Sequence, residues 1–244
     1  MPVSKYQGHH FQFFSPSPRW RPGLPITSGQ RIPIRRPAPP LRNKKLTIAA
    51  GFECNDGIIL ATDLEITGAA HKSLGGKSTV SCSNGNGVVI GGAGDYDVLA
   101  YACVEMTENV EGRDIASILK RLRGILKKIY LDHIHSCYEE SDRYTTLQLL
   151  VGIVSGGQRR LYRSNRSVLR RVGPYAFQGI GIDLSSYLAK QWWPKDYPTS
   201  DEAIGLARKI IHEVGENVPY VGTTANIIRL DLSGHGSFEP NEEA

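Results

Sequence analysis

Residues 46–63 read LTIAAGFECNDGIILATD. Two runs of apolar, small and β-branched residues, 46–53 and 57–62, flank the tetrapeptide Cys54-Asn55-Asp56-Gly57. Runs of this composition favour β-strands, and Asp-Gly between two such runs is a signal for a tight hairpin turn. We therefore expect an antiparallel pair of strands at the start of a folded domain.

Short strand-like segments continue after this hairpin. Those at 78–83 and 88–92 are separated by Asn84-Gly85-Asn86-Gly87, and others lie at 147–154, 160–163, 168–172 and 225–230. Helical segments fall between them, at 97–109, from Arg113 onward, from about Leu184, and at 203–214 after the capping box Thr199-Ser200-Asp201-Glu202. In the helix from Arg113, apolar residues recur every three or four positions, which indicates one buried stripe.

The order of these segments predicts the fold class. It is four strands, two helices, three strands, two helices and one strand. Strands grouped in runs argue against a doubly wound parallel sheet, in which strands and helices alternate singly. We expect an α+β protein: a four-layer αββα sandwich of two antiparallel sheets, formed by residues 46–232 and followed by an acidic flexible tail at 233–244.

The first 45 residues differ from the rest in composition. They hold nine Lys or Arg, no Asp or Glu, and nine of the 14 prolines of the chain. Such a segment buries too little apolar surface to offset its ordering entropy, so we expect a disordered leader that is dispensable for folding. Subtracting those nine from 29 basic residues leaves 20 against 24 acidic ones, so the domain carries about −4 although the chain carries +5.

Composition also excludes several classes of protein. No window approaches the roughly 18–20 apolar residues that cross a bilayer, so no transmembrane helix is expected. The four cysteines at 54, 82, 103 and 137 form no C-x-x-C pair and no Cys/His spacing typical of zinc. We expect reduced thiols, a cytoplasmic location, and neither a metal nor another cofactor.

Gly75-Gly76-Lys77-Ser78 invites comparison with a phosphate-binding loop. The full pattern requires glycine at the position of His71 and a helix after the lysine, where a strand is expected. The segment is therefore not interpreted as a nucleotide site.

An ordered set of short motifs resembles the proteasome-type N-terminal-nucleophile (Ntn) hydrolases, which include proteasome β-subunits and their bacterial relatives. The set begins with Thr47, the Asp56-Gly57 turn, and an apolar strand that ends in Ala61-Thr62-Asp63. It continues with Thr67-Gly68, Lys77 and Ala93-Gly94-Asp95-Tyr96, and then with Gly179-Ile180-Gly181 and Tyr220-Val221-Gly222. The resemblance covers roughly residues 46–231.

The resemblance implies catalytic roles for three residues and an oxyanion hole. Thr47 falls on the nucleophile and Asp63 on the catalytic aspartate, while Lys77 is the candidate catalytic lysine, reached with a gap of two residues. The backbone N–H groups of Gly92, Ala93 and Gly94 fall where the family stabilises the tetrahedral intermediate. A threonine hydroxyl is a weak nucleophile that needs an adjacent base, which the free α-amine of a first-residue threonine supplies.

The sequence departs from the family pattern at four positions. Leu46 precedes Thr47 where the family has a glycine, so a free amine requires processing or a start site adjacent to Thr47. The family's supporting aspartate falls on Val218, and its two supporting serines fall on Val221 and Ile180. These substitutions remove side-chain hydrogen bonds behind the threonine.

The resemblance implies a threonine-type peptidase with no cofactor, acting on a peptide or unfolded protein. It further implies a homo-oligomeric ring, with an ATPase as a candidate partner, no membrane and no nucleic acid. Two alternatives stay open at the level of the sequence. One is a non-catalytic assembly subunit of the same fold, with Thr47 buried behind the leader, and the other is an Ntn amidase acting on a small amide.

Overall fold

The hairpin expected at residues 46–63 lies inside a five-stranded antiparallel sheet. The structure, a computed structural model, describes residues 47–67, 72–74, 76–108, 112–135 and 146–240. Strands β1 (Ile48–Cys54) and β2 (Gly57–Asp63) pair antiparallel around the turn Asn55-Asp56. Every residue of both strands is buried, because both faces of the pair are covered by other elements.

The sheet that holds this hairpin has the strand order β10-β1-β2-β11-β12. Its other members are β10 (Tyr175–Gly179), β11 (Ala225–Asp231) and β12 (Gly236–Glu239). A second sheet has the order β5-β6-β7-β8-β9, and a short hairpin pairs β3 with β4. The strands of the second sheet are β5 (Ser78–Ser83), β6 (Asn86–Gly94), β7 (Leu147–Ser155), β8 (Gln158–Asn165) and β9 (Val168–Arg171). The short hairpin consists of β3 (Glu65–Thr67) and β4 (Lys72–Leu74).

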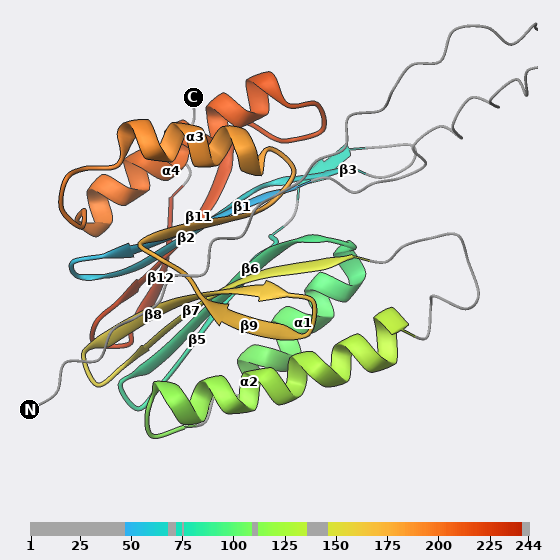
Figure 1. Ribbon diagram of the computed structural model, residues 1–244, viewed down its shortest axis with the longest axis vertical. Coiled ribbons are helices and arrows are strands. Elements are labelled where there is room, and N and C mark those ends of the chain that lie inside the picture. The colour runs from blue at the N-terminus through green and yellow to red at the C-terminus, as the bar shows by residue number, and fades with distance from the viewer. Residues whose placement is uncertain (1–46, 68–71, 75, 109–111, 136–145, 241–244) are drawn as a thin grey trace, which may run out of the picture. The chain divides into compact units, whose positions relative to one another are not determined.

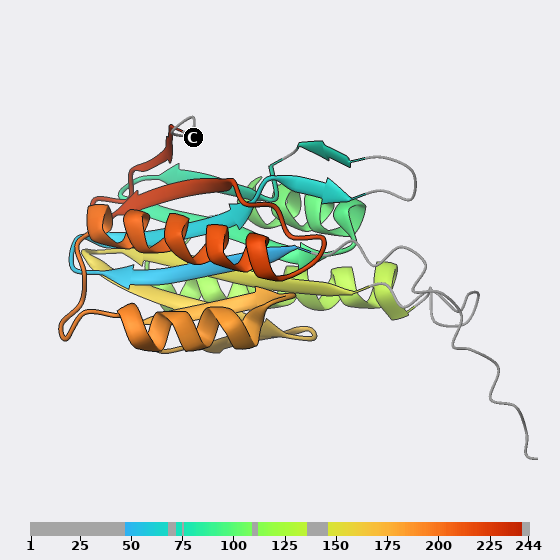
Figure 2. The ribbon, with the colours of Figure 1, turned by 90° about the horizontal axis from the view of Figure 1, so that it is seen from above.

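In the described part of the chain, four α-helices cover the outer faces of the two sheets (Figures 1 and 2). Helices α1 (Tyr96–Glu108) and α2 (Ile115–Ile129) pack on the second sheet, while α3 (Ile182–Trp192) and α4 (Ser200–Asn217) pack on the first. A six-residue π-helix, η1 (Tyr130–His135), continues α2. Three apolar clusters hold these layers together, one under each helix pair and one between the sheets.

Local sequence explains where the long helices begin. The Asp114 side chain accepts a hydrogen bond from the Ser117 N–H, and the Ser117 hydroxyl oxygen accepts one from the Asp114 N–H. The two bonds form a capping box at the start of α2. The expected box at Thr199 is confirmed, with Glu202 as its reciprocal partner at the start of α4. The apolar stripe of α2 is confirmed by Ile118, Leu122, Leu126 and Ile129, which are all buried in the cluster under the second sheet.

The expected fold class is confirmed, since the described residues form an α+β sandwich of two antiparallel sheets with helix pairs outside. Several elements were not expected: the β3–β4 hairpin, β10, β12 and η1. Strand β12 lies inside the segment 233–244 that was expected to form a flexible tail, and it pairs with β11 from Ile227↔Glu239 to Leu230↔Gly236. Strand pairing with β11 therefore extends the folded part to at least Glu239.

Some expectations fall outside the described residues. The leader at 1–45 and Cys137 are among them. The described cysteines Cys54, Cys82 and Cys103 are free thiols, as expected. Within the described residues, no helix has the length and apolar character needed to cross a membrane.

Candidate active site

Thr47, Asp63 and Lys77 converge at one end of the first sheet. Thr47 immediately precedes β1 and Asp63 ends β2, so the antiparallel register brings them side by side. Lys77 lies one residue before β5, on the facing sheet. Its Nζ donates a hydrogen bond to Thr47 Oγ1 and forms an ion pair with Asp63 Oδ1 at 3.0 Å. The structure thus joins the three residues singled out from the sequence.

The ammonium of Lys77 has three N–H donors, and all three have acceptors. Besides Thr47 Oγ1 and Asp63 Oδ1, the Lys77 Nζ donates to the backbone oxygen of Glu65. This set of acceptors fixes the position of Nζ and stabilises its protonated form. The lysine is therefore held as a cation directly beside the threonine hydroxyl.

Asp63 is held by the backbone as well as by Lys77. Its Oδ1 accepts from the N–H of Ile48 at 3.1 Å, and its Oδ2 accepts from the N–H of Gly222 at 3.2 Å. The Gly222 contact explains the place of Tyr220-Val221-Gly222 in the set of motifs. The carboxylate is thereby fixed by β1 and by the segment that precedes β11.

All three side chains are shielded from solvent. Thr47 is 5% exposed, Asp63 0% and Lys77 4%. Burial lowers the pKa of Lys77 below its ordinary value, and the nearby Asp63 opposes this shift. Burial raises the pKa of Asp63, opposed by Lys77 and by the two backbone N–H groups. In such a site, charge interactions are stronger than in water.

The main chain of Thr47 is positioned by the Gly179-Ile180-Gly181 segment. The Ile180 N–H donates to the Thr47 carbonyl oxygen at 3.0 Å. Gly179 has a φ of +101°, and a Cβ at this position would lie 1.9 Å from the same oxygen. Only glycine allows this close approach, so the first glycine of the motif supports the geometry of Thr47.

The three residues predicted to form an oxyanion hole differ in how their N–H groups are used. The Gly92 N–H donates to the Lys77 carbonyl at 3.2 Å, and the Asp95 N–H donates to Thr146 O on the other side at 2.8 Å. Because N–H directions alternate along a strand, the N–H of Ala93 faces β7 and that of Gly94 faces the side of Lys77. This pattern favours Gly94 over Gly92 and Ala93 as the donor to an oxyanion.

Val218, Val221 and Ile180 belong to the apolar cluster under α3 and α4. The three positions where the resemblance implied polar side chains are thus occupied by apolar side chains that pack in this cluster. Two backbone contacts persist there, because the N–H of Ile180 binds Thr47 and the N–H next to Val221, that of Gly222, binds Asp63. Thr47 and Asp63 are therefore oriented by main-chain groups at this side of the site.

The buried cysteines are poor candidates for a nucleophile. Burial raises the pKa of the Cys54 and Cys103 thiols to about 12, so neither forms a thiolate near neutral pH. Over the described ranges, no group of three or more His, Cys, Asp or Glu side chains is arranged to hold a metal ion.

The sequence did not reveal the backbone partners at Glu65 and Gly222, nor a basic pocket lined by residues of η1 and β7 to β10. A signal for the pocket is present in the sequence. The forty residues 143–182 contain seven arginines and no acidic residue. Four of these arginines, Arg163, Arg166, Arg170 and Arg171, line the pocket described below.

No protein-family model and no curated protein matches the sequence. Solved structures do match. Anbu (ancestral beta-subunit) from Yersinia bercovieri is similar with a TM-score of 0.63 and 15% identity, over 78% of this chain and 86% of that one. An Anbu Gly-1 mutant from Hyphomicrobium sp. strain MC1 gives a TM-score of 0.65 and 12% identity, over 80% and 86% of the two chains.

The Anbu complex from Pseudomonas aeruginosa, described as a helical assembly, gives a TM-score of 0.67 and 13% identity, over 81% of this chain and 88% of that one. Identities this low establish the fold alone. The chain therefore has the proteasome-like Ntn-hydrolase fold of the Anbu structures.

Proposed function

We propose that the protein is a threonine-type amide hydrolase acting on peptides, with Thr47 as its nucleophile after cleavage of the Leu46–Thr47 bond. The observation that carries the proposal is the buried contact of Lys77 Nζ with both Thr47 Oγ1 and Asp63 Oδ1. A buried carboxylate neutralises the lysine cation, and the cation lies beside the threonine hydroxyl. Such an arrangement is more typical of a nucleophilic catalytic site than of a purely structural core.

The proposed reaction begins with attack of Thr47 Oγ on the amide carbon of the substrate. The hydroxyl proton passes to the freed α-amine of Thr47, whose ordinary pKa of about 7.7–8.0 makes it a base near neutral pH. The Gly94 N–H and the Lys77 cation stabilise the negative charge on the carbonyl oxygen. The α-ammonium then protonates the departing amine, which leaves an ester on Thr47.

Water completes the cycle. The α-amine takes a proton from a water molecule that attacks the ester carbon, and the released Thr47 hydroxyl recovers its proton from the α-ammonium. Asp63 holds Lys77 in its charged form throughout. Neither a metal ion nor an organic cofactor is required by these steps.

Two versions of the protein test the proposal. One is the full chain, and the other begins Met-Thr47, from which an aminopeptidase removes the methionine because threonine is small. We expect the second to hydrolyse fluorogenic peptides and the first to do so only after cleavage before Thr47. Thr47→Ala should abolish hydrolysis, and Lys77→Ala should lower kcat/KM by at least ~100-fold, as for loss of a positioned catalytic group.

The control is the folded state of each variant, measured by circular dichroism and melting. A folded protein with a free Thr47 amine that hydrolyses no member of a broad peptide library would contradict the proposal. It would favour a non-catalytic assembly subunit, in which the replacement of polar groups by Val218, Val221 and Ile180 has removed activity. A Thr47→Ala protein that stays active would place the nucleophile elsewhere.

A further inference from the structure

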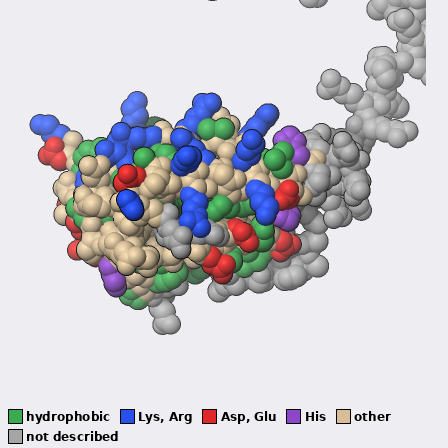
Figure 3. All heavy atoms as spheres, turned by 90° about the horizontal axis from the view of Figure 1, so that it is seen from below, with side chains coloured by type: hydrophobic (Ala, Val, Ile, Leu, Met, Phe, Trp, Pro, Cys, Tyr) green, Lys and Arg blue, Asp and Glu red, His purple; other side chains and the backbone are tan. Residues whose placement is uncertain are grey.

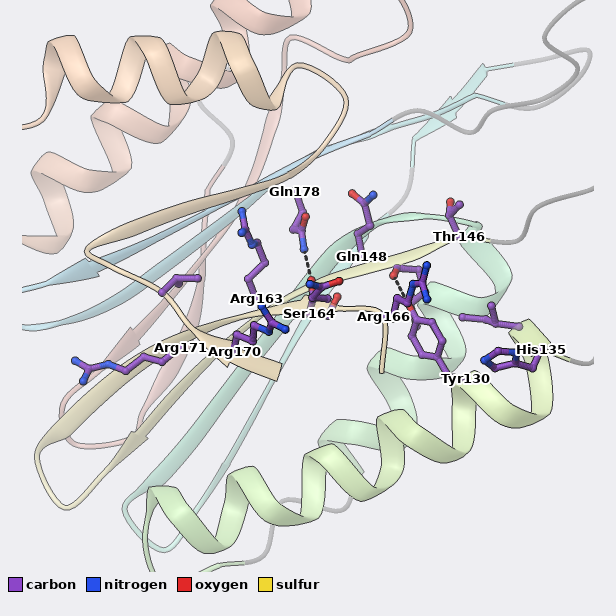
Figure 4. A pocket seen from close by; sticks show the side chains of 14 residues that line it. Tyr130, His135, Thr146, Gln148, Arg163, Ser164, Arg166, Arg170, Arg171 and Gln178 are labelled. Carbon is purple, nitrogen blue, oxygen red and sulfur yellow. Dashed lines mark hydrogen bonds between the residues drawn. The ribbon is translucent and has the colours of Figure 1, made fainter. Parts of the chain in front are cut away.

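The structure contains a basic pocket of about 730 Å³, whose lining side chains are drawn in Figure 4. Its walls come from η1, β7, β8, β9 and β10, and none of the described residues that line it is Asp or Glu. Four arginines line it, Arg163, Arg166, Arg170 and Arg171. Figure 3 shows that Lys and Arg side chains also gather along one side of the face it views, although the sequence from residue 47 onward is acidic overall.

The positions of two of these arginines destabilise the pairing of β8 with β9. Arg163 on β8 and Arg170 on β9 are direct cross-strand partners, so their side chains project from the same face of the hairpin. Like charges in this position destabilise a sheet. Both side chains are exposed, and the described lining of the pocket holds no carboxylate that could neutralise them. An anionic ligand would relieve this repulsion.

Several other polar groups of the pocket are held by internal hydrogen bonds. The buried Ser164 accepts from the Leu149 N–H at 2.8 Å, and Gln178 Nε2 donates to the Ser164 carbonyl at 2.9 Å. The Tyr130 hydroxyl donates to Leu147 O at 2.8 Å. Tyr130 and His135 belong to the π-helix, and such helices frequently occur at functional sites. Hydrogen bonds therefore hold Tyr130, Ser164 and Gln178 in place within the lining of the pocket.

The pocket adjoins Thr47 through Gln148 and Gln178. The Gln148 side chain lines the pocket and accepts from the Gly179 N–H at 2.8 Å. Gly179 pairs with Ile48 and closely approaches the Thr47 carbonyl oxygen, while Gln178 pairs with Ala49. One wall of the pocket is thus the strand that borders the first residues of β1.

We infer that this pocket, which we name the arginine pocket, binds carboxylates of an acidic peptide segment and thereby selects acidic substrates for Thr47. The role in substrate selection rests on the proposed function. The binding of carboxylates rests on the arginines alone. Arg guanidinium groups bind carboxylates through paired N–H donors. The described residues bring two aromatic rings to the wall, those of Tyr130 and His135, against four arginines, so charge rather than base stacking dominates the recognition that this lining offers.

A binding assay that involves no hydrolysis tests the inference. The full chain carrying Thr47→Ala is titrated against fluorescein-labelled hexaglutamate and hexaglutamine at physiological salt, with fluorescence anisotropy as the readout. We expect hexaglutamate to bind at least ~10-fold more tightly than hexaglutamine. Replacing both Arg163→Gln and Arg170→Gln should weaken hexaglutamate binding at least ~10-fold without lowering the melting temperature.

The matched control removes the same charge elsewhere. Lys190→Gln with Lys195→Gln, at exposed positions on α3 and just after it, should change binding less than twofold. Equal weakening in both double variants would overturn the inference, because it would report only net charge. Binding of inorganic phosphate or of a single-stranded oligonucleotide, but not of hexaglutamate, would assign the pocket to a different ligand and would also overturn it.

Hydrolysis by the protein that begins at Thr47 separates this inference from the proposed function. We expect a higher kcat/KM for acidic than for neutral peptides, and we expect the double arginine variant to lose that preference. Hydrolysis without any such preference, together with no hexaglutamate binding, would overturn the pocket while Thr47 stands as nucleophile. Arginine-dependent binding without hydrolysis of any peptide would support carboxylate recognition and overturn the role of Thr47.

Discussion

At the scale of single residues, Lys77 links the parts of the candidate site. Its ammonium joins the threonine hydroxyl, the carboxylate of Asp63 and a backbone carbonyl, and its own carbonyl accepts from Gly92. A buried cation of this kind is stable only while its carboxylate partner is present. The charge state of Lys77 therefore determines both the order and the proposed reactivity of the site.

We predict a bell-shaped dependence of kcat/KM on pH for the protein that begins at Thr47. Activity should rise between about pH 6 and 8 as the α-amine loses its proton and becomes a base. It should fall again at a pH below the ordinary lysine value of 10.5, because burial lowers the pKa of Lys77 and the neutral amine no longer stabilises the oxyanion. Activity that stays constant up to pH 10.5 would contradict this role for Lys77.

A second prediction concerns a buried hydroxyl. Thr62 is 0% exposed, and its Oγ1 has no hydrogen-bond partner among the described residues. Thr62→Val keeps the shape of the side chain and removes the unsatisfied group, so we expect a gain of about 1 kcal/mol in the free energy of unfolding. Denaturant unfolding measures it. Thr107→Val is the matched control, because Thr107 Oγ1 donates to the Cys103 carbonyl at 2.7 Å, and this variant should gain nothing.

At the scale of elements, the β8–β9 hairpin carries charge that its own pairing does not favour. Arg163 lies directly opposite Arg170, and Tyr162 lies opposite Arg171. Strands placed at the edge of a sheet are often charged, which discourages pairing with other chains. Here, however, the two arginines share one face and line a pocket, so edge protection alone does not explain their placement.

We predict that Arg163→Glu stabilises this hairpin. An opposite-charge pair with Arg170 replaces a like-charge pair, a change worth about 0.2–1 kcal/mol in strand pairing. Arg163→Gln, which removes the repulsion without adding attraction, should lie between the wild type and Arg163→Glu in melting temperature. A melting temperature for Arg163→Glu below that of the wild type would show that the two arginines do not repel each other.

The elements differ in how well the sequence predicts them. Strands β1, β2, β6 and β7 were expected because burial on both faces leaves continuous apolar runs. Strand β10 is short and bounded by Pro174 and Gly179, so it resembles a loop until its pairing with β1 is known. Strand β12 is polar and partly exposed, and only its register with β11 defines it.

The candidate site shows the same division. Thr47, Asp63 and Lys77 were predictable because each occupies a fixed place relative to a strand end. The arginine pocket was not, because its lining comes from five elements that converge only in the folded protein. The preference for Gly94 within the predicted oxyanion segment depends on hydrogen-bond direction, which a sequence does not state.

At the scale of the whole molecule, one face of the helical layer carries apolar side chains that its own core does not bury. Tyr101 and Val104 on α1 are 39% and 50% exposed, and Leu131 on η1 is 53% exposed. The Tyr101 ring packs edge-on against His133, with ring centroids 4.8 Å apart. Exposed apolar side chains grouped in this way are typical of protein–protein contacts.

We predict that the protein self-associates through this face, and a ring is one arrangement that such contacts permit. Light scattering should give a mass several times that of the 26.9 kDa chain at micromolar concentration. Val104→Lys with Leu131→Lys should dissociate the assembly, whereas Tyr187→Lys, at a 61% exposed position on α3, is the control and should not. A wild-type protein that scatters only as a monomer would contradict the prediction.

The central claim is that Thr47 acts through its own hydroxyl and its own free α-amine. A peptide epoxyketone tests both groups together, because a neighbouring amine and hydroxyl can each form a bond with it. Intact-mass spectrometry of the protein that begins at Thr47 should show addition of one inhibitor, and fragmentation should locate it on Thr47. Thr47→Ala should give no adduct. An adduct on another residue, or none on a folded protein with a free Thr47 amine, would contradict the account.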